Sequence, residues 1–244
     1  MSTILSIVDN LSGVKMHQNI SSVQKLEATR TISDSLFIEL QTAIIRGELS
    51  AGSKISEPEL ARKFGVSRAP LREAISRLEG QKLVERRAHV GARVVSLTLK
   101  ELVEISYMRE ALEGMACRLA AKNMTEEEIF KLKYLLSVHE KNEDLQDGHA
   151  YYQKEGDLDF HYCIVQGSHN NKLIKLLCDE LYHLIRMYRY QFSVDTPRPK
   201  HAFDEHHAIV AAIEHRDAEL SEQLMRKHIS AARENIEKQY LDKC

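Results

Sequence analysis

The stretch SEPELARKFGVSRAPLREAISRLEG, residues 56–80, contains two short helical patterns separated by one turn. The second pattern begins at Ser67, a residue type that caps helices well, and Pro70 falls in the first turn, where backbone N–H groups lack a helical partner. Gly80 is suited to end this helix. The apolar residues between them recur at helical spacing and predict one buried stripe: Leu71, Ala74, Ile75 and Leu78.

The first pattern, SEPELARKFG (56–65), predicts a shorter helix that Ser56 caps and Gly65 ends. Two short helices joined by a tight turn are typical of the helix-turn-helix, whose second helix enters the major groove of DNA. Arg68 and Arg72 lie off the apolar stripe, near the positively polarised start of the second helix, where an anion is favoured. For this stretch alone, a solvated charged face is the ordinary alternative.

The residues that follow extend the basic character of this region. In KLVERRAHVGARVVS (82–96), strand-favouring segments surround Leu83–Val84 and Arg93–Val95, and RRAHVG between them is predicted to form a basic hairpin tip, or wing. From Arg62 to Arg93 there are nine Lys or Arg against three Glu, a local charge of +6, whereas the whole chain of 244 residues carries −2. Such a local basic excess indicates a DNA-binding domain.

Residues 36–95 resemble the N-terminal domain of the GntR superfamily of bacterial transcription regulators, above all over IIRGELSAGSKISEPELARKFGVSRAPLREAISRLEGQKLV. The resemblance implies a winged helix-turn-helix that binds operator DNA. Some relatives carry a basic residue at the start of the preceding helix, where this chain has Pro58, so that contact is not carried over. The residues implied to meet the operator lie on the reader helix and the wing: Ser67, Arg68, Ala69, Arg72, His89 and Gly91.

The rest of the chain predicts an all-α domain, so the expected fold class is mainly α. Helical patterns lie near 98–122, 125–142, 149–167, 171–192, 198–215 and 217–240, and the short breaks between them are typical of a bundle. Residues 98–244 carry 20 Lys or Arg against 26 Asp or Glu, an acidic balance that argues against DNA contact. This half resembles the FCD-type sensor domain of the FadR-like branch. The expected domains are a flexible arm (1–30), the winged helix-turn-helix (31–97) and an effector-binding and dimerisation domain (98–244).

Composition narrows the location and the chemistry. The chain has no run of 18 apolar residues, which argues against a membrane span. The first 30 residues lack the basic-then-apolar layout of a signal peptide, so a cytoplasmic location is expected. The cysteines, at positions 117, 163, 178 and 244, lack the CxxC spacing of zinc knots and are expected to be free thiols, mostly buried.

Four polar residues fall on inward stripes of the acidic half: Asp157 and His161 in GDLDFHYCIV, His206 in DEHHAIVAAI, and His228 in EQLMRKHISAARENI. Such groups are costly to bury unless they satisfy one another or bind a cation. One carboxylate and three imidazoles suit zinc, nickel or another first-row divalent ion, and an ordinary buried hydrogen-bond network is the alternative. The layout DxxxH … EH … H resembles that of metal-binding members of the superfamily, which implies His206 rather than His207 as the ligand.

Arg109 lies within the apolar stripe of its predicted helix. A buried arginine favours a carboxylate or phosphate, so it either pairs internally with Glu113 or Asp157 or binds an acidic ligand. The resemblance implies an effector-facing position, and Arg186 is a second candidate. A metal ion beside Arg109 would suit a small organic acid. A hydroxylated di- or tricarboxylate is expected, while monocarboxylates and sugar acids stay open.

The combined features predict a ligand-responsive DNA-binding regulator that acts as a homodimer on two-fold operator DNA. The superfamily habit implies repression that the ligand releases. A metal-dependent hydrolase is the alternative from another class, but it offers only Glu205 as a nearby base and leaves the basic winged helix unexplained. A DNA-binding protein with a purely structural metal is the third possibility. The remaining histidines of this half are expected at the surface or in loops: His139, His149, His169, His183, His201 and His215.

Overall fold

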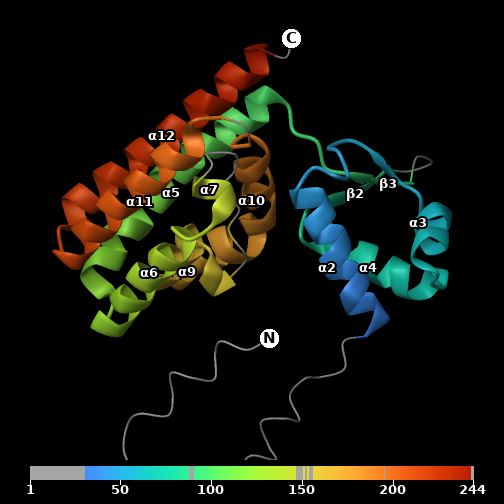
Figure 1. Ribbon diagram of the computed structural model, residues 1–244, viewed down its shortest axis with the longest axis horizontal. Helices are drawn as coiled ribbons and strands as arrows, with labels where there is room; N and C mark the ends of the chain where they lie inside the picture. Colours follow the sequence, from blue (N-terminus) through green and yellow to red (C-terminus); the bar gives the residue numbers. More distant parts are fainter. Residues whose placement is uncertain are drawn as a thin grey trace, which may run out of the picture.

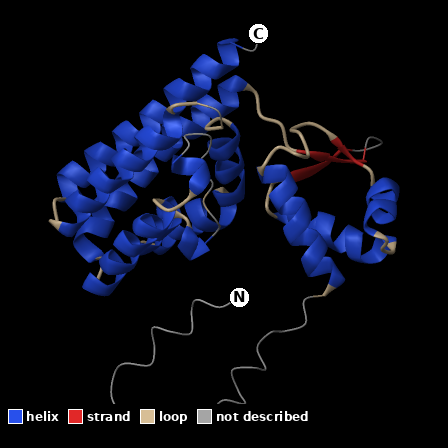
Figure 2. Cartoon of the chain, viewed as in Figure 1, coloured by secondary structure: helices blue, strands red, loops and turns tan. Residues whose placement is uncertain are grey.

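The computed structural model describes residues 31–87, 91–146, 151, 153, 156–194 and 196–242. The chain forms a small N-terminal part and a larger helical part that lie side by side (Figure 1). The strands of the described residues are confined to the N-terminal part (Figure 2). The mainly α architecture predicted from the sequence is confirmed. Among the described residues, no helix combines the length and the apolar character needed to cross a membrane.

The N-terminal part is a three-helix unit with a small antiparallel sheet. Its elements are α2 (Ile32–Ile45), β1 (Lys54–Ile55), α3 (Glu57–Phe64), α4 (Arg68–Gly80), β2 (Val84–Arg87) and β3 (Gly91–Val94). The strand order is β1-β3-β2, with Val84 opposite Val94 and Lys54 opposite Arg93. The predicted helix-turn-helix and wing strands are therefore present. The sequence analysis did not identify α2 and β1 as separate elements.

Helix α4 packs its predicted stripe into the core of this part. Leu71, Ala74, Ile75 and Leu78 are all completely buried, as the spacing of these residues requires. Gly65 ends α3 with a left-handed backbone (φ 65°), which glycine adopts without strain and which turns the chain toward α4. The opposite face of α4 is left in solvent.

The helical part is built around two long helices. Its elements are α5 (Leu99–Asn123), α6 (Glu126–His139), α7 (Glu143–Gln146), the short 3-10 turn η1 (Gly156–Leu158), α8 (Phe160–Gly167), α9 (Asn171–Ile174), the π-helical turn η2 (Lys175–Glu180), α10 (Tyr182–Gln191), α11 (Arg198–Glu214) and α12 (Ala218–Asp242). Thr98 and Thr125 start α5 and α6 with reciprocal capping boxes. Helices α5 and α12 lie against each other along much of their length (Figure 1). Gly114 permits this approach, because a Cβ there would lie 2.7 Å from Cγ of Arg226.

Two predicted helices are wrong in extent. The pattern at 149–167 becomes a helix only from Phe160, because Gly156 adopts φ 65° and the side chain of Asp159 caps the backbone N–H groups of the first turn of α8. Residues 147–150, 152, 154 and 155 lie outside the described part of the chain. The pattern at 171–192 is divided into α9, η2 and α10, since a π-helical turn shifts the helical register before Tyr182.

Helix α10 joins the two parts. The backbone N–H of Leu97 donates to the hydroxyl of Tyr188 over 2.7 Å, and the side-chain amide of Gln191 donates to the carbonyl of Ile44 over 2.9 Å. Apolar residues of α10 share one buried cluster with α2 and α4. The helical part therefore continues the core of the N-terminal part instead of hanging from it by a linker.

Candidate functional site

The predicted reader residues lie together on the exposed face of α4. Ser67, Arg68, Ala69 and Arg72 are all exposed along its first turns. Nε of Arg72 donates to Oε2 of Glu57 over 2.7 Å, yet the arginine side chain is 60% exposed and accessible to a larger anion. This face meets the geometric requirement for a helix that reads DNA.

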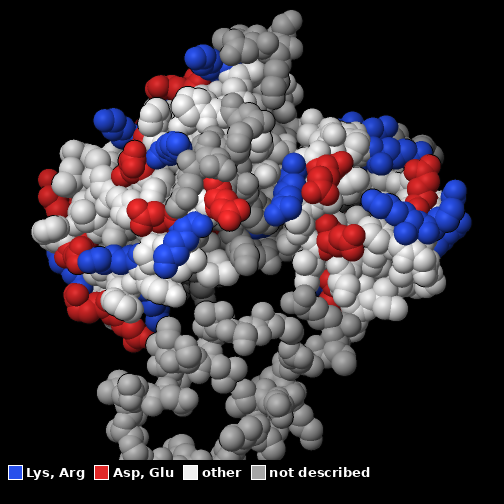
Figure 3. All heavy atoms as spheres, in the orientation of Figure 1, with Lys and Arg blue, Asp and Glu red and all other residues white. Residues whose placement is uncertain are grey.

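The wing lies at the same end of the molecule. Gly91 is exposed and begins β3 with φ 92°, whereas His89 lies outside the described residues. Lys and Arg side chains gather over α3 and the β2–β3 strands in Figure 3, at the end far from the helical part. Basic residues of the predicted DNA-binding region therefore gather on this face, with acidic residues among them.

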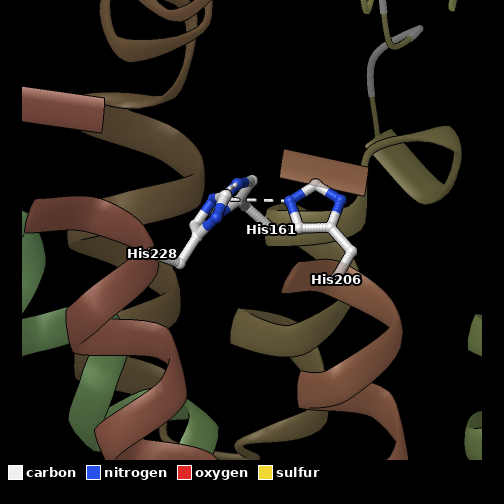
Figure 4. A group of neighbouring side chains, drawn as sticks. All are labelled: His161, His206 and His228. Atoms are coloured by element: carbon white, nitrogen blue, oxygen red, sulfur yellow. Dashed lines mark hydrogen bonds between the residues drawn. The ribbon is translucent and has the colours of Figure 1, made fainter. Parts of the chain in front are cut away.

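Three histidines from three helices meet inside the helical part. His161 comes from α8, His206 from α11 and His228 from α12, and none is more than 5% exposed. Nε2 of His228 lies 3.3 Å from Nε2 of His206 and 3.3 Å from Nε2 of His161 (Figure 4). Of the described residues, this is the group whose ligand atoms are close enough to share a metal ion. His207 points away and is exposed.

Carboxylates orient two of these rings. Oε2 of Glu113 lies 2.7 Å from Nδ1 of His161, and Oε2 of Glu205 lies 2.6 Å from Nδ1 of His228. An ionised carboxylate only accepts hydrogen bonds, so Nδ1 carries the hydrogen in both rings. In a neutral imidazole the lone pair is then on Nε2, the atom that faces the cluster.

The third ring, that of His206, is oriented by a series of hydrogen bonds between uncharged groups. Nε2 of His139 lies 3.3 Å from the Leu158 carbonyl and must donate to it, so Nδ1 of a neutral His139 accepts from the Tyr151 hydroxyl over 2.8 Å. The Tyr151 oxygen then accepts from Nδ1 of His206 over 3.3 Å. His206 therefore also turns its Nε2 lone pair toward the cluster. The expectation that His139 lies at the surface was wrong, because it is buried against this tyrosine.

Burial keeps the three rings neutral. It lowers the pKa of His161, lowers that of His206 well below its usual value, and lowers that of His228 to about 3 against the opposing hydrogen bond from Glu205. Burial alone would raise the pKa of Glu113, but the charge of Arg109 and the hydrogen bonds from His161 and Arg109 outweigh it and lower that pKa. Neutral imidazoles backed by ionised carboxylates are the form in which histidines bind metal ions.

The predicted fourth ligand, Asp157, lies in η1, four residues before His161. Its side chain is outside what the structure describes, so the structure does not place it at the cluster. Its neighbour Asp159 is completely buried, caps α8 and forms an ion pair with Arg189. The helical spacing argued for Asp157 does not hold, since the regular helix begins only at Phe160.

The two predicted effector arginines have different positions. Arg109 is buried and pairs with Glu113 (Nε–Oε1 2.6 Å), the internal pair considered as an alternative, and it also lines the pocket beside the histidines. Arg186 donates to the carbonyl of Gln153 and does not belong to the described residues that line this pocket. Arg189 and Arg198, which the sequence analysis did not single out, line it instead.

The histidines form one wall of a pocket with an empty volume of about 820 Å³. This volume includes space that is open to solvent. The polar lining at the histidine end is supplied by His161, His206, His228, Arg109, Arg189, Arg198, Tyr151 and Gln153. The arrangement can hold a cation and, beside it, an acidic group of a small molecule.

Sequence reasoning named Glu113 as a possible partner of Arg109 and Glu205 as a possible base, but it did not identify them as the groups that orient the rings. Glu113 is 48 residues from His161 and Glu205 is 23 residues from His228, so no local spacing reveals these contacts. Tyr151 lies in an irregular segment and has no periodic signal. Its role follows only from the fold.

Comparisons with known proteins identify the family of each part of the chain. Residues 32–94 match the family described as bacterial regulatory proteins, gntR family, and residues 104–231 match the FCD domain. The chain belongs to the GntR family. It is a DNA-binding transcription regulator and not an enzyme.

Individual relatives of this GntR protein are regulators as well. The probable D-xylose utilization operon transcriptional repressor of Paenarthrobacter nicotinovorans is 33% identical over 77% of this chain and 81% of its own length. The transcriptional repressor GlaR of Escherichia coli is 30% identical over 78% of this chain and 89% of its own length. The solved structure of E. coli McbR/YncC superposes with a TM-score of 0.67 at 20% identity and covers 86% of this chain and 99% of its own, which shows the shared fold.

Proposed function

We propose that this GntR-family protein is a repressor that leaves its operator when a small organic acid binds at a divalent metal ion in the helical part. One observation carries the proposal. Three neutral imidazoles from three helices turn their Nε2 lone pairs toward one point, with Nε2 of His228 3.3 Å from Nε2 of each of the other two. A hydrogen-bond acceptor fixes each ring from behind. A divalent cation at that point would accept all three lone pairs, whereas without a cation they repel.

The ion would be held by His161, His206 and His228, with Asp157 as the proposed fourth ligand. Zinc and nickel suit this mixture of nitrogen and oxygen donors best. The ion would supply positive charge that attracts an acidic ligand. Among the arginines, Arg109, Arg189 and Arg198 line the same end of the pocket and would orient that ligand. Arg186, proposed from the sequence, is the weakest candidate because it donates to a backbone carbonyl.

Operator recognition is proposed to use Ser67, Arg68, Ala69 and Arg72 of α4 together with His89 and Gly91 of the wing. One winged helix contacts few base pairs, so a homodimer on a two-fold operator is proposed. The domain boundaries proposed are 1–30, 31–97 and 98–244, and a protein that acts on chromosomal DNA would be cytoplasmic. Light scattering of the protein with its operator would reveal the dimer.

The function is tested by measuring operator release with and without metal. Protein loaded with zinc or nickel and chelator-treated protein are each bound to a fluorescent operator and titrated with a panel of organic acids. The expected result is release by at least one acid from the metal-loaded protein only. Equal release from both forms would mean that the metal is structural, and it would contradict the proposed sensing site.

A further inference from the structure

The two ends of the pocket differ in chemistry. At the end away from the histidines the lining is aliphatic and aromatic and comes from α5, α10 and α12: Leu102, Ile105, Leu184, Tyr188, Phe192 and Ile236. Leu102, Leu184 and Ile236 belong to the buried cluster shared with the N-terminal part. Phe160, whose ring stacks on His206 with centroids 3.8 Å apart, belongs to the separate core of the helical part. The apolar end therefore faces the DNA-binding part.

Polar side chains at this apolar end already donate hydrogen bonds to backbone carbonyls. The hydroxyl of Ser193 donates to the carbonyl of Tyr190 over 2.8 Å, and the amide of Asn235 donates to the carbonyl of Phe192 over 2.7 Å. The hydroxyl of Ser106 likewise donates to the carbonyl of Leu102 over 2.8 Å. A second ligand carboxylate buried there would lose its water and find both serine hydrogens already used, because a carboxylate can only accept hydrogen bonds.

The charges at the histidine end are also largely balanced. Arg109 pairs with Glu113 and Arg198 pairs with Glu205, at 2.6 and 2.7 Å. Arg189 pairs with the buried Asp159. Imidazoles that bind a metal ion are neutral, so the positive charge that attracts a ligand would come mainly from the ion. One carboxylate meets that requirement, and further carboxylates would face ion pairs that are already complete.

We propose that the effector is an amphipathic monocarboxylic acid, with its carboxylate at the histidine end and a hydrocarbon body against α5, α10 and α12. The proposal rests on the proposed function, because it assumes an acid bound at the metal site. It differs from the hydroxylated di- or tricarboxylate expected from the sequence. The hydrocarbon body would lie against Tyr188, whose hydroxyl accepts from Leu97 at the junction with the DNA-binding part. A bound ligand would therefore contact α10, the helix that joins the two parts.

The test is a chain-length series of unbranched acids, from acetate to octanoate, titrated into zinc-loaded protein by calorimetry, with citrate and gluconate as polar comparators. Each buried methylene is expected to tighten binding about fourfold until the pocket is filled. Octanoate should therefore bind at least a hundredfold more tightly than acetate and more tightly than citrate.

Two neighbouring alanines provide a matched pair of variants. Ala232 lines the pocket and Ala231 does not, although both are half-buried residues of α12. Ala232→Phe should reduce the space in the pocket and weaken octanoate binding at least tenfold more than it weakens acetate binding. Ala231→Phe should bind both acids like the parent protein. Ile105→Thr, a milder change in the same wall, should reduce the affinity gained per methylene.

The outcomes separate the two proposals. If citrate or gluconate binds more tightly than every unbranched acid, or affinity does not depend on chain length, the amphipathic effector is wrong and the metal-dependent acid sensor stands. If no acid binds to zinc-loaded protein, the proposed function itself fails. If octanoate binds equally to Ala232→Phe and to the parent protein, the hydrocarbon body does not occupy this end of the pocket.

Discussion

Arg72 is paired with a carboxylate that operator DNA would have to displace. In the absence of DNA it pairs with Glu57, which also lies 3.8 Å from Arg86 of the wing strand. An exposed pair of this kind contributes little stability, so Arg72 can exchange the carboxylate for a base edge at small cost. Arg72→Ala should weaken operator binding by about 1–3 kcal/mol and reduce sequence discrimination without affecting folding.

Fluorescence anisotropy with operator and scrambled DNA measures both effects. Glu57→Gln is the control, because it removes the competing charge and should leave operator affinity unchanged or higher. Normal affinity and discrimination in Arg72→Ala would show that α4 does not read the operator through this residue.

His183 lies where the two parts meet, with Nδ1 3.4 Å from the side-chain amide of Gln41 in α2. Burial, and then the charge of Arg186, lower the pKa of His183 from 6.5 to about 4. The unfolded chain therefore binds the proton more readily, so this contribution to stability is complete above about pH 6.5 and is lost as the pH falls toward 4.

His183→Gln should consequently lose less stability between pH 7.5 and 5 than the parent protein, by on the order of 1 kcal/mol. Urea denaturation at the two pH values measures the difference. Parallel loss of stability in both proteins would mean that His183 protonates as easily in the folded state as in the unfolded state.

At this scale the sequence predicted the three inward histidines, because each lies in line with apolar residues on its own helix. It could not predict that they converge, since that depends on how α8, α11 and α12 pack. It also placed His139 at the surface, although its ring anchors Tyr151. The side chain of a single residue gives no periodic signal that distinguishes an anchor from a solvated group.

Helix α8 carries His161 and ends at a glycine with little space around it. A Cβ on Gly167 would lie 2.6 Å from Cγ and 2.8 Å from Sδ of the buried Met124. Gly167→Ala should therefore overpack this contact and destabilise the protein by about 1–3 kcal/mol. Gly80→Ala is the matched control, because nothing lies within 4 Å of a Cβ at the end of α4. That change should be neutral or stabilise by up to about 1 kcal/mol.

Urea denaturation compares the two glycine variants with the parent protein. Equal stability of Gly167→Ala and Gly80→Ala would mean that Met124 moves aside freely and that the contact does not fix α8.

Helix boundaries were predictable where caps and stripes agreed. Thr98 and Thr125 start α5 and α6 within a residue or two of the predicted positions. The pattern at 149–167 failed because Asp159 competes as a cap within it, and the pattern at 171–192 failed because apolar periodicity does not reveal a π-helical turn. In both places local hydrogen bonds, and not the hydrophobic pattern, determine the backbone conformation.

At the scale of the whole molecule, α10 is the feature that unites the two parts. It contributes Tyr188 and Arg189 to the pocket and Gln191 to a hydrogen bond with α2. A shift of α10 on ligand binding would alter contacts with both the pocket and the DNA-binding part. The sequence predicted a basic N-terminal part and an acidic helical part from charge and periodicity. It did not predict that the two parts share a core, because the apolar face of α10 resembles that of any bundle helix.

Metal binding by the three histidines is tested most directly by elemental analysis of protein purified without chelator, combined with melting temperatures after adding zinc or nickel. About one divalent ion per chain is expected in the parent protein and in His207→Ala, with a higher melting temperature when the ion is added to chelator-treated protein. His161→Ala and His228→Ala should hold no ion and show no such rise, while still binding the operator. Absence of stoichiometric metal from the parent protein, with no rise in melting temperature on adding either ion, would contradict the metal site.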